Sequence, residues 1–231
     1  MTDENGARQT SVNPRFRKGR ALLFRLAITA AALVAWFWTQ SMIGKRSLPA
    51  SGIGDGLLVW TTPVNSYLYE HHGAANALLI ASSGIIDLLG VFLLAKWIFG
   101  PSVRPFLGLV LVLGLRQLMQ ALVALPAPEN TIWHYPGFPS LLVTYGVAND
   151  YFFSGHTAIA VLGATELGRI GKRWVTGIAI LIVVFEVATV LVLRAHYTMD
   201  VFTGAIAALY VAYLAGRISP SIDRLIGNAT T

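Results

Sequence analysis

At residues 149–157 the chain reads NDYFFSGHT, and at residues 196–200 it reads HYTMD. Each stretch stands where a long apolar run begins, and one complete apolar run, residues 175–193, lies between them. If that run crosses a bilayer once, the helices that follow the two stretches begin on the same side of the membrane. We therefore expect His156 and His196 to face one membrane interface.

The composition is typical of a membrane protein. The 231 residues are 55% hydrophobic and 12% charged, with a mean hydropathy of +0.62, which excludes an ordinary soluble domain. Six of the 17 basic residues lie between Arg8 and Arg25, beside the first apolar run. The net charge of +6 therefore indicates anionic lipid headgroups, not nucleic acid, as the partner. The chain has no cysteine, so a thiolate nucleophile and a cysteine metal site are excluded.

Six apolar segments approach the roughly 20 residues that a membrane-spanning helix requires. We predict an all-α, polytopic membrane protein with six transmembrane helices in one domain, residues 21–217. A basic cytoplasmic tail (1–20) precedes this domain, and a short cytoplasmic tail (218–231) follows it. The six predicted spans are 21–43, 74–99, 103–125, 151–169, 175–193 and 197–216.

Lysine and arginine gather in alternate loops. The positive-inside rule then places both termini in the cytoplasm and all five histidines on the extracytoplasmic side. Two outer segments are long. Residues 44–73 mix apolar and aromatic side chains that suit the membrane interface, and the four prolines of residues 126–149 predict a loop instead of a helix.

The two polar stretches carry residue types suited to phosphoryl transfer. His196 and Asp200 are four residues apart, so on a helix the carboxylate can accept a hydrogen bond from one ring nitrogen and leave the other nitrogen to a substrate. Ser154 fits a helix N-cap, and Gly155 allows an anion to approach the first-turn N–H groups. His156 would stand beside that anion and donate a proton to a leaving oxygen. The pattern favours a covalent phosphohistidine, without a metal or a cofactor.

Several residues keep a purely structural interpretation open. Interfacial histidines often cap helices, and a His–Asp pair at this spacing also occurs in ordinary helices. Arg194 either contacts a substrate phosphate or reaches toward the lipid headgroups. Trp133 and Tyr135 either hold a quaternary ammonium by cation–π contact or belong to the interfacial aromatic belt. Glu186, deep within a predicted span, is a candidate structural partner for Arg116.

The motifs resemble those of a known group of membrane enzymes. SGH at 154–156 with HxxxD at 196–200 is similar to the type-2 phosphatidate phosphatase superfamily, which is built on a six-helix core. The longer matches, at 150–157 and 196–201, resemble the sphingomyelin synthase branch and its relative, plant phosphatidylcholine:diacylglycerol cholinephosphotransferase. Arg116, followed after eight residues by LPAP, agrees with both relatives. The phosphatase branch's own Lys and Arg-Pro spacing is absent, which favours headgroup transfer over monophosphate hydrolysis.

The resemblance implies roles for individual residues. His196 would be the nucleophile that attacks the headgroup phosphorus, Asp200 its orienting carboxylate, and His156 the acid and base for the leaving and incoming lipid hydroxyls. The other candidates are substrate-binding or phosphate-binding residues within or beside the motifs. They are Arg116, Asp150, Ser154, Gly155, Arg194 and Tyr197.

The predicted function is transfer of a phosphocholine-type or phosphoethanolamine-type headgroup from a phospholipid donor to a lipid hydroxyl, such as that of diacylglycerol or ceramide. If water intercepts the phosphohistidine, the same residues give a phospholipase C or a lipid phosphate phosphatase. A lipid transporter or scramblase, whose path the polar residues would line, is the alternative from a different class. In each case the partners are membrane lipids.

Overall fold

The computed structural model describes residues 52–143, 145 and 151–226, together with positions 23, 26–31, 33–35, 37–39, 41 and 42. Residues 1–51 and 52–231 form two compact units. Most of the described positions of the first unit lie within an apolar helix, Leu26–Thr39. The predicted basic tail, residues 1–20, lies outside the described residues. The second unit carries both histidine stretches.

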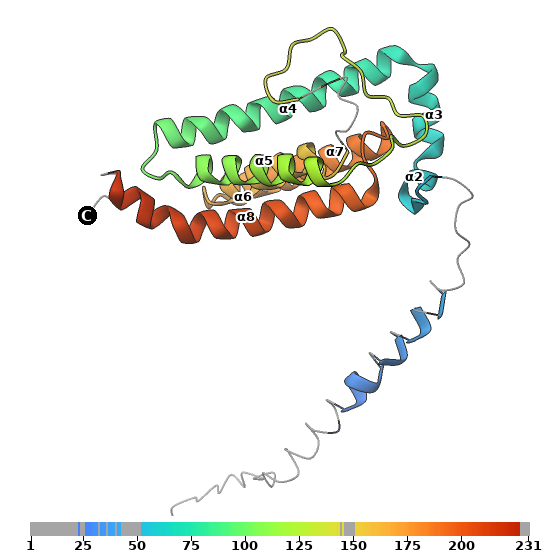
Figure 1. Cartoon of the computed structure of the whole chain (residues 1–231), viewed down its shortest axis with the longest axis horizontal. Helices are drawn as coiled ribbons and strands as arrows, with labels where there is room; N and C mark the ends of the chain where they lie inside the picture. Colours follow the sequence, from blue (N-terminus) through green and yellow to red (C-terminus); the bar gives the residue numbers. More distant parts are fainter. Residues whose placement is uncertain are drawn as a thin grey trace, which may run out of the picture. The chain divides into compact units, whose positions relative to one another are not determined.

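The second unit is a helical bundle without a β-strand in its described part (Figure 1). Two short helices, α2 and α3, precede five longer ones. The helices are α2 (Gly56–Trp60), α3 (Thr62–Glu70), α4 (His72–Ile98), α5 (Arg104–Leu122), α6 (Gly155–Gly168), α7 (Arg173–Val192) and α8 (Thr198–Leu225).

Four helices, α4, α5, α7 and α8, are long and apolar enough to cross a membrane. To this extent the predicted all-α membrane protein is confirmed. The helix predicted from residue 151 begins only at Gly155 and has 14 residues. At 1.5 Å per residue α6 is about 21 Å long, shorter than a hydrocarbon core of about 30 Å. The span predicted at residues 21–43 is only partly described.

Helix α6 lies at the centre of the bundle and packs against α4, α5, α7 and α8. Every residue from His156 to Gly163 is buried, as expected for a helix surrounded by other helices. A Cβ added at Gly163 would lie 2.8 Å from Leu89 Cδ2, so α4 approaches α6 closely at this glycine.

A stripe of small residues lets α8 pack closely against its neighbours. Gly204, Ala208, Ala212 and Ala215 are buried and recur every three or four residues, the spacing of small residues that favours helix packing in membranes. At Gly204 the approach is closest, because an added Cβ would lie 2.6 Å from the backbone oxygen of Ser154.

Charged side chains tie the helices together at one end of the bundle. The buried Glu166 carboxylate binds Lys96 at 3.2 Å, Arg104 at 2.8 Å and Arg169 at 3.4 Å. Asp223 accepts a hydrogen bond from the N–H of Val103 at 2.7 Å. This contact accompanies the extension of α8 to Leu225, beyond the predicted end of the span at residue 216.

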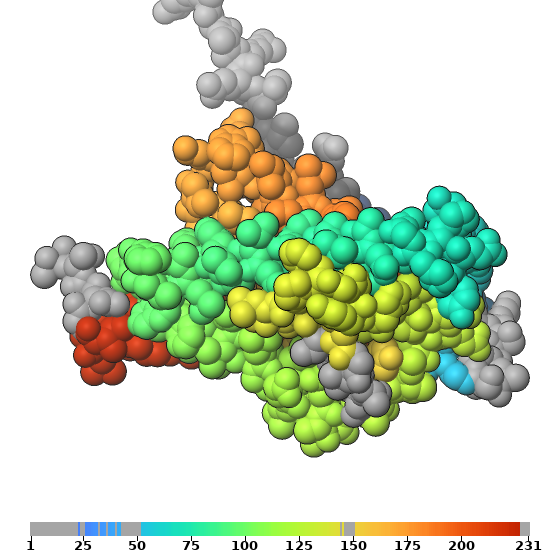
Figure 2. All heavy atoms as spheres, turned by 90° about the horizontal axis from the view of Figure 1, so that it is seen from above, coloured from blue at the N-terminus to red at the C-terminus, as the bar shows by residue number. Residues whose placement is uncertain are grey.

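The two histidine stretches lie at the opposite end of the bundle. His196 directly precedes the first turn of α8, whereas Asp223 lies in its last turns, and 28 helical residues measure about 42 Å. The proline-rich segment is a loop over its described residues, 126–143 and 145, as predicted. Seen from above in Figure 2, α4 runs along the bundle with α7 on one side and the segment after α5 on the other.

We expect Gly204→Ala to destabilise the bundle by about 1–3 kcal/mol, because the new methyl group meets a backbone oxygen that no rotamer change can move. Gly177→Ala on α7 is the control, since an added Cβ there has no neighbour within 4 Å. Thermal unfolding followed by intrinsic tryptophan fluorescence measures both variants. Equal melting temperatures for Gly204→Ala and wild type would contradict the close packing.

Candidate active site

The first histidine stretch contains the start of α6. Ser154 is the N-cap, and its Oγ accepts a hydrogen bond from the N–H of Thr157 at 3.3 Å. A serine suits this position because its oxygen satisfies one of the unpaired N–H groups of the first turn. The predicted N-cap is therefore confirmed, and it places His156, which is buried, in the first turn of α6.

The second stretch begins α8 with a carboxylate cap. Asp200 Oδ2 accepts a hydrogen bond from the N–H of Tyr197 at 2.9 Å. The same oxygen lies 3.9 Å from His196 Nδ1, which is beyond hydrogen-bonding distance. Asp200 thus fixes the first turn of α8, whereas the sequence suggested that it would hold the imidazole ring directly.

The backbone carbonyl of Tyr151 holds the His196 ring. Nδ1 of His196 lies 2.8 Å from this oxygen. A carbonyl oxygen can only accept a hydrogen bond, so Nδ1 carries the proton and the neutral ring has its lone pair on Nε2. The side-chain pattern gave no signal for this contact because the acceptor belongs to the main chain.

Two hydrogen bonds join the histidine stretches directly. The first is the contact between His196 and Tyr151. The second runs from the N–H of Ser154 to the backbone oxygen of Asp200 at 3.1 Å. Residues 151–154 make these contacts in a non-helical conformation, so α6 starts later than predicted.

A small cavity lies between the two stretches. Its volume is about 40 Å³, room for about three water molecules. Arg116, His156 and His196 line it, so residues from α5, α6 and the turn before α8 meet at one site. The other lining residues are Ile86, Leu113, Trp133, Leu142, Val143, Tyr151, Gly155, Ile159 and Ala195.

Arg116 reaches this cavity from α5. Its Nε donates a hydrogen bond to the backbone oxygen of Phe153 at 3.0 Å. A Cβ added at Gly155 would lie 2.9 Å from the same nitrogen. The glycine therefore makes room for the guanidinium group beside the first turn of α6.

His156 presents an unpaired polar atom. Its Nε2 is buried and has no hydrogen-bond partner among the described residues, which is uncommon for a buried polar group. The Trp133 ring meets the His156 ring edge-on, with centroids 5.0 Å apart and an interplanar angle of 87°. The ring is thereby packed on one side, while Nε2 remains available to a ligand.

The proline-rich loop brings aromatic side chains to the site. Trp133 packs against Tyr145 with ring centroids 5.2 Å apart, and Tyr135 lies 6.2 Å from Tyr145. The Tyr145 hydroxyl is hydrogen-bonded to Ser83 on α4. Burial raises the pKa of Tyr145, an effect that the Ser83 hydrogen bond opposes and the Asp87 carboxylate reinforces, so the phenol stays neutral.

Asp87 on α4 holds this loop in place. Its carboxylate accepts hydrogen bonds from the N–H groups of Leu141 at 2.8 Å and Leu142 at 2.9 Å. Leu142 and Val143 then form part of the cavity wall. A carboxylate within a candidate span is costly, and these backbone donors compensate it.

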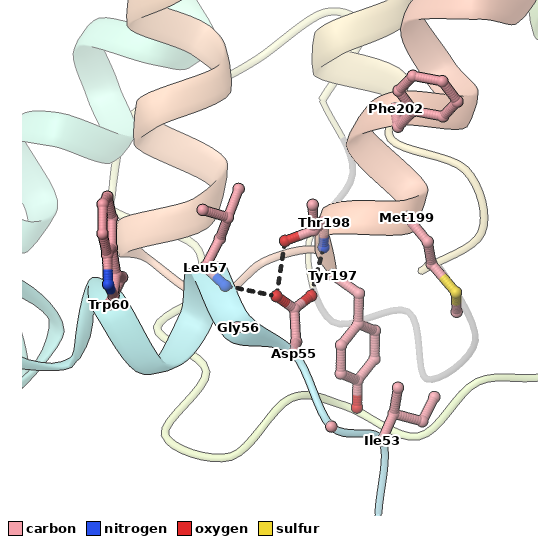
Figure 3. A pocket seen from close by; sticks show the side chains of 10 residues that line it. Ile53, Asp55, Gly56, Leu57, Trp60, Tyr197, Thr198, Met199 and Phe202 are labelled. Atoms are coloured by element: carbon pink, nitrogen blue, oxygen red, sulfur yellow. Dashed lines mark hydrogen bonds between the residues drawn. The ribbon is translucent and has the colours of Figure 1, made fainter. Parts of the chain in front are cut away.

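Asp55 joins α2 to the start of α8 and was not among the predicted residues. Its Oδ1 accepts hydrogen bonds from the N–H of Leu57 at 3.0 Å and the hydroxyl of Thr198 at 2.6 Å, and its Oδ2 accepts the N–H of Thr198 at 2.6 Å (Figure 3). One carboxylate thus caps two helices. An aspartate before the apolar run at 57–59 was the only sequence signal.

Arg194 lies away from the cavity wall. Its guanidinium donates hydrogen bonds to the backbone oxygens of Glu129 at 2.8 Å and Leu58 at 3.2 Å, and to the Thr62 hydroxyl at 2.9 Å. Its backbone φ of 52° lies in the left-handed region, which turns the chain sharply just before His196. Through these contacts Arg194 joins α2, α3 and the proline-rich loop.

The remaining residues that the sequence suggested are Tyr197, Asp150 and Glu186, and none of them is among the described residues that line the cavity. Tyr197 lines a separate groove with Asp55, and Asp150 lies outside the described residues. Glu186 accepts a hydrogen bond from Ser82 at 2.6 Å, whereas the sequence suggested Arg116. In the described part of the chain, no three His, Asp or Glu side chains are placed to hold a metal ion.

Comparisons with known proteins agree on one group of enzymes. The sequence model of a family described as AtPDCT1/2 matches residues 55–217, a range that includes both histidine stretches, Arg116 and Asp55. Phosphatidylcholine:diacylglycerol cholinephosphotransferase 1 from Arabidopsis thaliana is 22% identical over 187 residues. That match covers 81% of this chain and 60% of the Arabidopsis protein. No solved structure matches the chain.

We expect Asp55→Ala to cost about 2 kcal/mol of stability, since it removes two helix caps worth about 1 kcal/mol each. Thr198→Val is the matched variant: it removes only the hydroxyl bond to Asp55 and keeps the shape of the side chain. Its effect is expected to be smaller. Tryptophan-fluorescence melting compares the two variants, and an Asp55→Ala loss no larger than that of Thr198→Val would argue against a double cap.

Proposed function

The chain belongs to the AtPDCT1/2 family, and from this membership we propose that it transfers the phospho-headgroup of a glycerophospholipid to a lipid hydroxyl. The similar Arabidopsis protein is named for transfer between phosphatidylcholine and diacylglycerol. These two lipids are therefore the donor and acceptor that we propose. Ceramide is a second acceptor, on the resemblance to sphingomyelin synthases.

The hydrogen bond from His196 Nδ1 to the Tyr151 carbonyl is the observation that best supports this chemistry. It leaves the lone pair on Nε2, the nitrogen that must attack phosphorus. His196 lines the cavity together with His156 and Arg116. A nucleophile, an acid and a phosphate-binding cation are the three groups that phosphoryl transfer without a metal requires.

In the first half-reaction, His196 Nε2 forms a bond to the phosphorus of the donor lipid. The P–O bond to the glycerol oxygen breaks at the same centre. Protonated His156 gives its proton to that oxygen, so that diacylglycerol leaves as a neutral alcohol. The headgroup phosphate remains bonded to His196.

The second half-reaction reverses these roles. The acceptor hydroxyl gives its proton to neutral His156 while its oxygen bonds to phosphorus, and the P–N bond to His196 breaks. His196 regains its lone pair and His156 its proton, so no cofactor is consumed. Arg116 would bind the phosphate oxygens through both half-reactions, because its planar fork matches their geometry.

The aromatic side chains suit a choline headgroup. Trp133, Tyr135 and Tyr145 are grouped beside His156. A quaternary ammonium has no N–H to donate and is bound well by aromatic faces. We propose that these rings hold the trimethylammonium group while the phosphate occupies the cavity.

The proposed topology keeps six spans. The six are the apolar segment 21–43 and helices α4 to α8, the number of helices in the core of the type-2 phosphatidate phosphatases. The basic end, with Lys96, Arg104 and Arg169, would face the cytoplasm with both termini. The histidines, at the other end of α8, would then meet lipids of the extracytoplasmic leaflet.

We expect His196→Ala to lower headgroup transfer by about three orders of magnitude or more, because no other group can form the covalent intermediate. The assay uses purified protein in vesicles with headgroup-labelled phosphatidylcholine and diacylglycerol. His71→Ala is the control, since His71 is exposed, does not line the cavity, and has its Nδ1 paired with the backbone oxygen of Tyr67. Retained headgroup transfer by His196→Ala would refute the mechanism. Lipid movement across the vesicle membrane that His196→Ala leaves intact, without headgroup transfer by the wild type, would favour a transporter or scramblase.

The same assay separates transfer from hydrolysis. We expect the labelled headgroup to move from the donor phosphatidylcholine to the unlabelled diacylglycerol. The acceptor then becomes labelled phosphatidylcholine, and the label stays in the lipid fraction. Water-soluble phosphocholine as the sole product would identify a phospholipase C instead. An acid-labile phosphate adduct on residue 196, detected by mass spectrometry of protein quenched at high pH, would support the intermediate.

A further inference from the structure

A groove separate from the catalytic cavity runs between the start of α2 and the first turns of α8 (Figure 3). Its volume is about 670 Å³, within the range of about 300–1,000 Å³ that is usual for ligand pockets. Most of its wall is apolar. The apolar side chains that line it are Ile53, Leu57, Trp60, Met199 and Phe202.

These apolar side chains are all exposed, from Ile53 at 37% upward. Trp60 is 84% exposed and Phe202 is 67% exposed. An apolar surface of this kind is costly in water, at about 25 cal/mol per Å². It is therefore suited to an apolar partner.

The charged side chain in the groove wall is already hydrogen-bonded within the protein. Asp55 is the single charged residue among those that line it. Its Oδ1 accepts the hydrogen bonds of Leu57 and Thr198, and its Oδ2 accepts the N–H of Thr198. Because these donors already satisfy the carboxylate, recognition in the groove rests on apolar contact.

The groove connects the surface of α8 with the turn that carries the nucleophile. Below Phe202, α8 exposes Ile206, Leu209 and Tyr213 at helical spacing, so one apolar stripe follows this candidate span inward. At the other end of the groove, Tyr197 directly follows His196, and consecutive Cα atoms are about 3.8 Å apart. The groove and the catalytic cavity therefore adjoin the same turn, the groove through Tyr197 and the cavity through His196.

We propose that this groove binds an acyl chain of the diacylglycerol unit that reacts at His196. The inference rests on the proposed function. The leaving group of the donor and the incoming acceptor are both diacylglycerols, so one groove serves both half-reactions. Its apolar wall, its hydrogen-bonded carboxylate and its continuity with the stripe on α8 favour a hydrocarbon chain as the ligand.

Photolabelling tests the groove independently of catalysis. The protein is placed in phosphatidylcholine vesicles that contain a diacylglycerol with a diazirine among the first carbons of one acyl chain, next to the ester. We expect labelling to concentrate on residues 53–60 and 197–202. Labelling spread evenly over exposed apolar positions, such as Leu181 on α7, would overturn the proposal.

Leu57→Trp, which fills the groove, adds a functional test. We expect it to lose most of the groove labelling and to lower the rate ratio of dioleoyl-glycerol to dihexanoyl-glycerol as acceptor by about fivefold. Leu209→Trp is the control, since Leu209 lies on the same stripe but outside the groove. Unchanged melting temperatures show that both variants fold.

The outcomes distinguish the two proposals. An unaltered chain-length preference in folded Leu57→Trp would refute the acyl-chain groove while headgroup transfer stands. Groove labelling in a wild-type protein that transfers no headgroup would refute the proposed function and keep the groove as a lipid-binding site.

Discussion

The placement of the two histidines depends on two hydrogen bonds between the segments that carry them. The N–H of Ser154 binds the backbone oxygen of Asp200, and the ring of His196 binds the backbone oxygen of Tyr151. Each bond uses at least one main-chain atom, so the geometry does not rely on two flexible side chains meeting. Gly204 completes this junction, because its missing side chain lets α8 approach Ser154. Arg116 and the proline-rich loop are arranged around this fixed pair.

The aspartates of the bundle share one structural task. Asp55, Asp87, Asp200 and Asp223 each accept a hydrogen bond from a backbone N–H group. A carboxylate near or within a membrane is costly unless donors compensate it, and main-chain donors at helix starts and in loops supply that compensation here. Three of the four connect segments that are distant in sequence. These hydrogen bonds thereby add to the apolar contacts that join the helix ends, such as those of Leu58 with Val190 and Val201.

Much of the fold follows from side-chain patterns, and the rest depends on the main chain. The apolar runs predicted the four long helices, Ser154 predicted the start of a helix, and the prolines predicted the loop. The late start of α6 and the carbonyl that orients His196 were not predictable, because both need an acceptor on a distant backbone segment. Arg194 is the clearest example of a side chain whose partners the sequence did not predict. An arginine beside a catalytic motif suggested phosphate binding, but a left-handed turn directs it to the oxygens of Leu58 and Glu129.

The hydrogen bonds between Thr198 and Asp55 also determine which segments can be exchanged between related proteins. A chimera that took only α4 to α8 from one protein would leave the first turn of α8 dependent on a foreign aspartate, in a foreign α2, for its cap. The natural crossover point therefore lies before residue 52, where the second compact unit begins. Recombination at that point would transfer the groove, the Asp55 cap and the turn that carries His196 together.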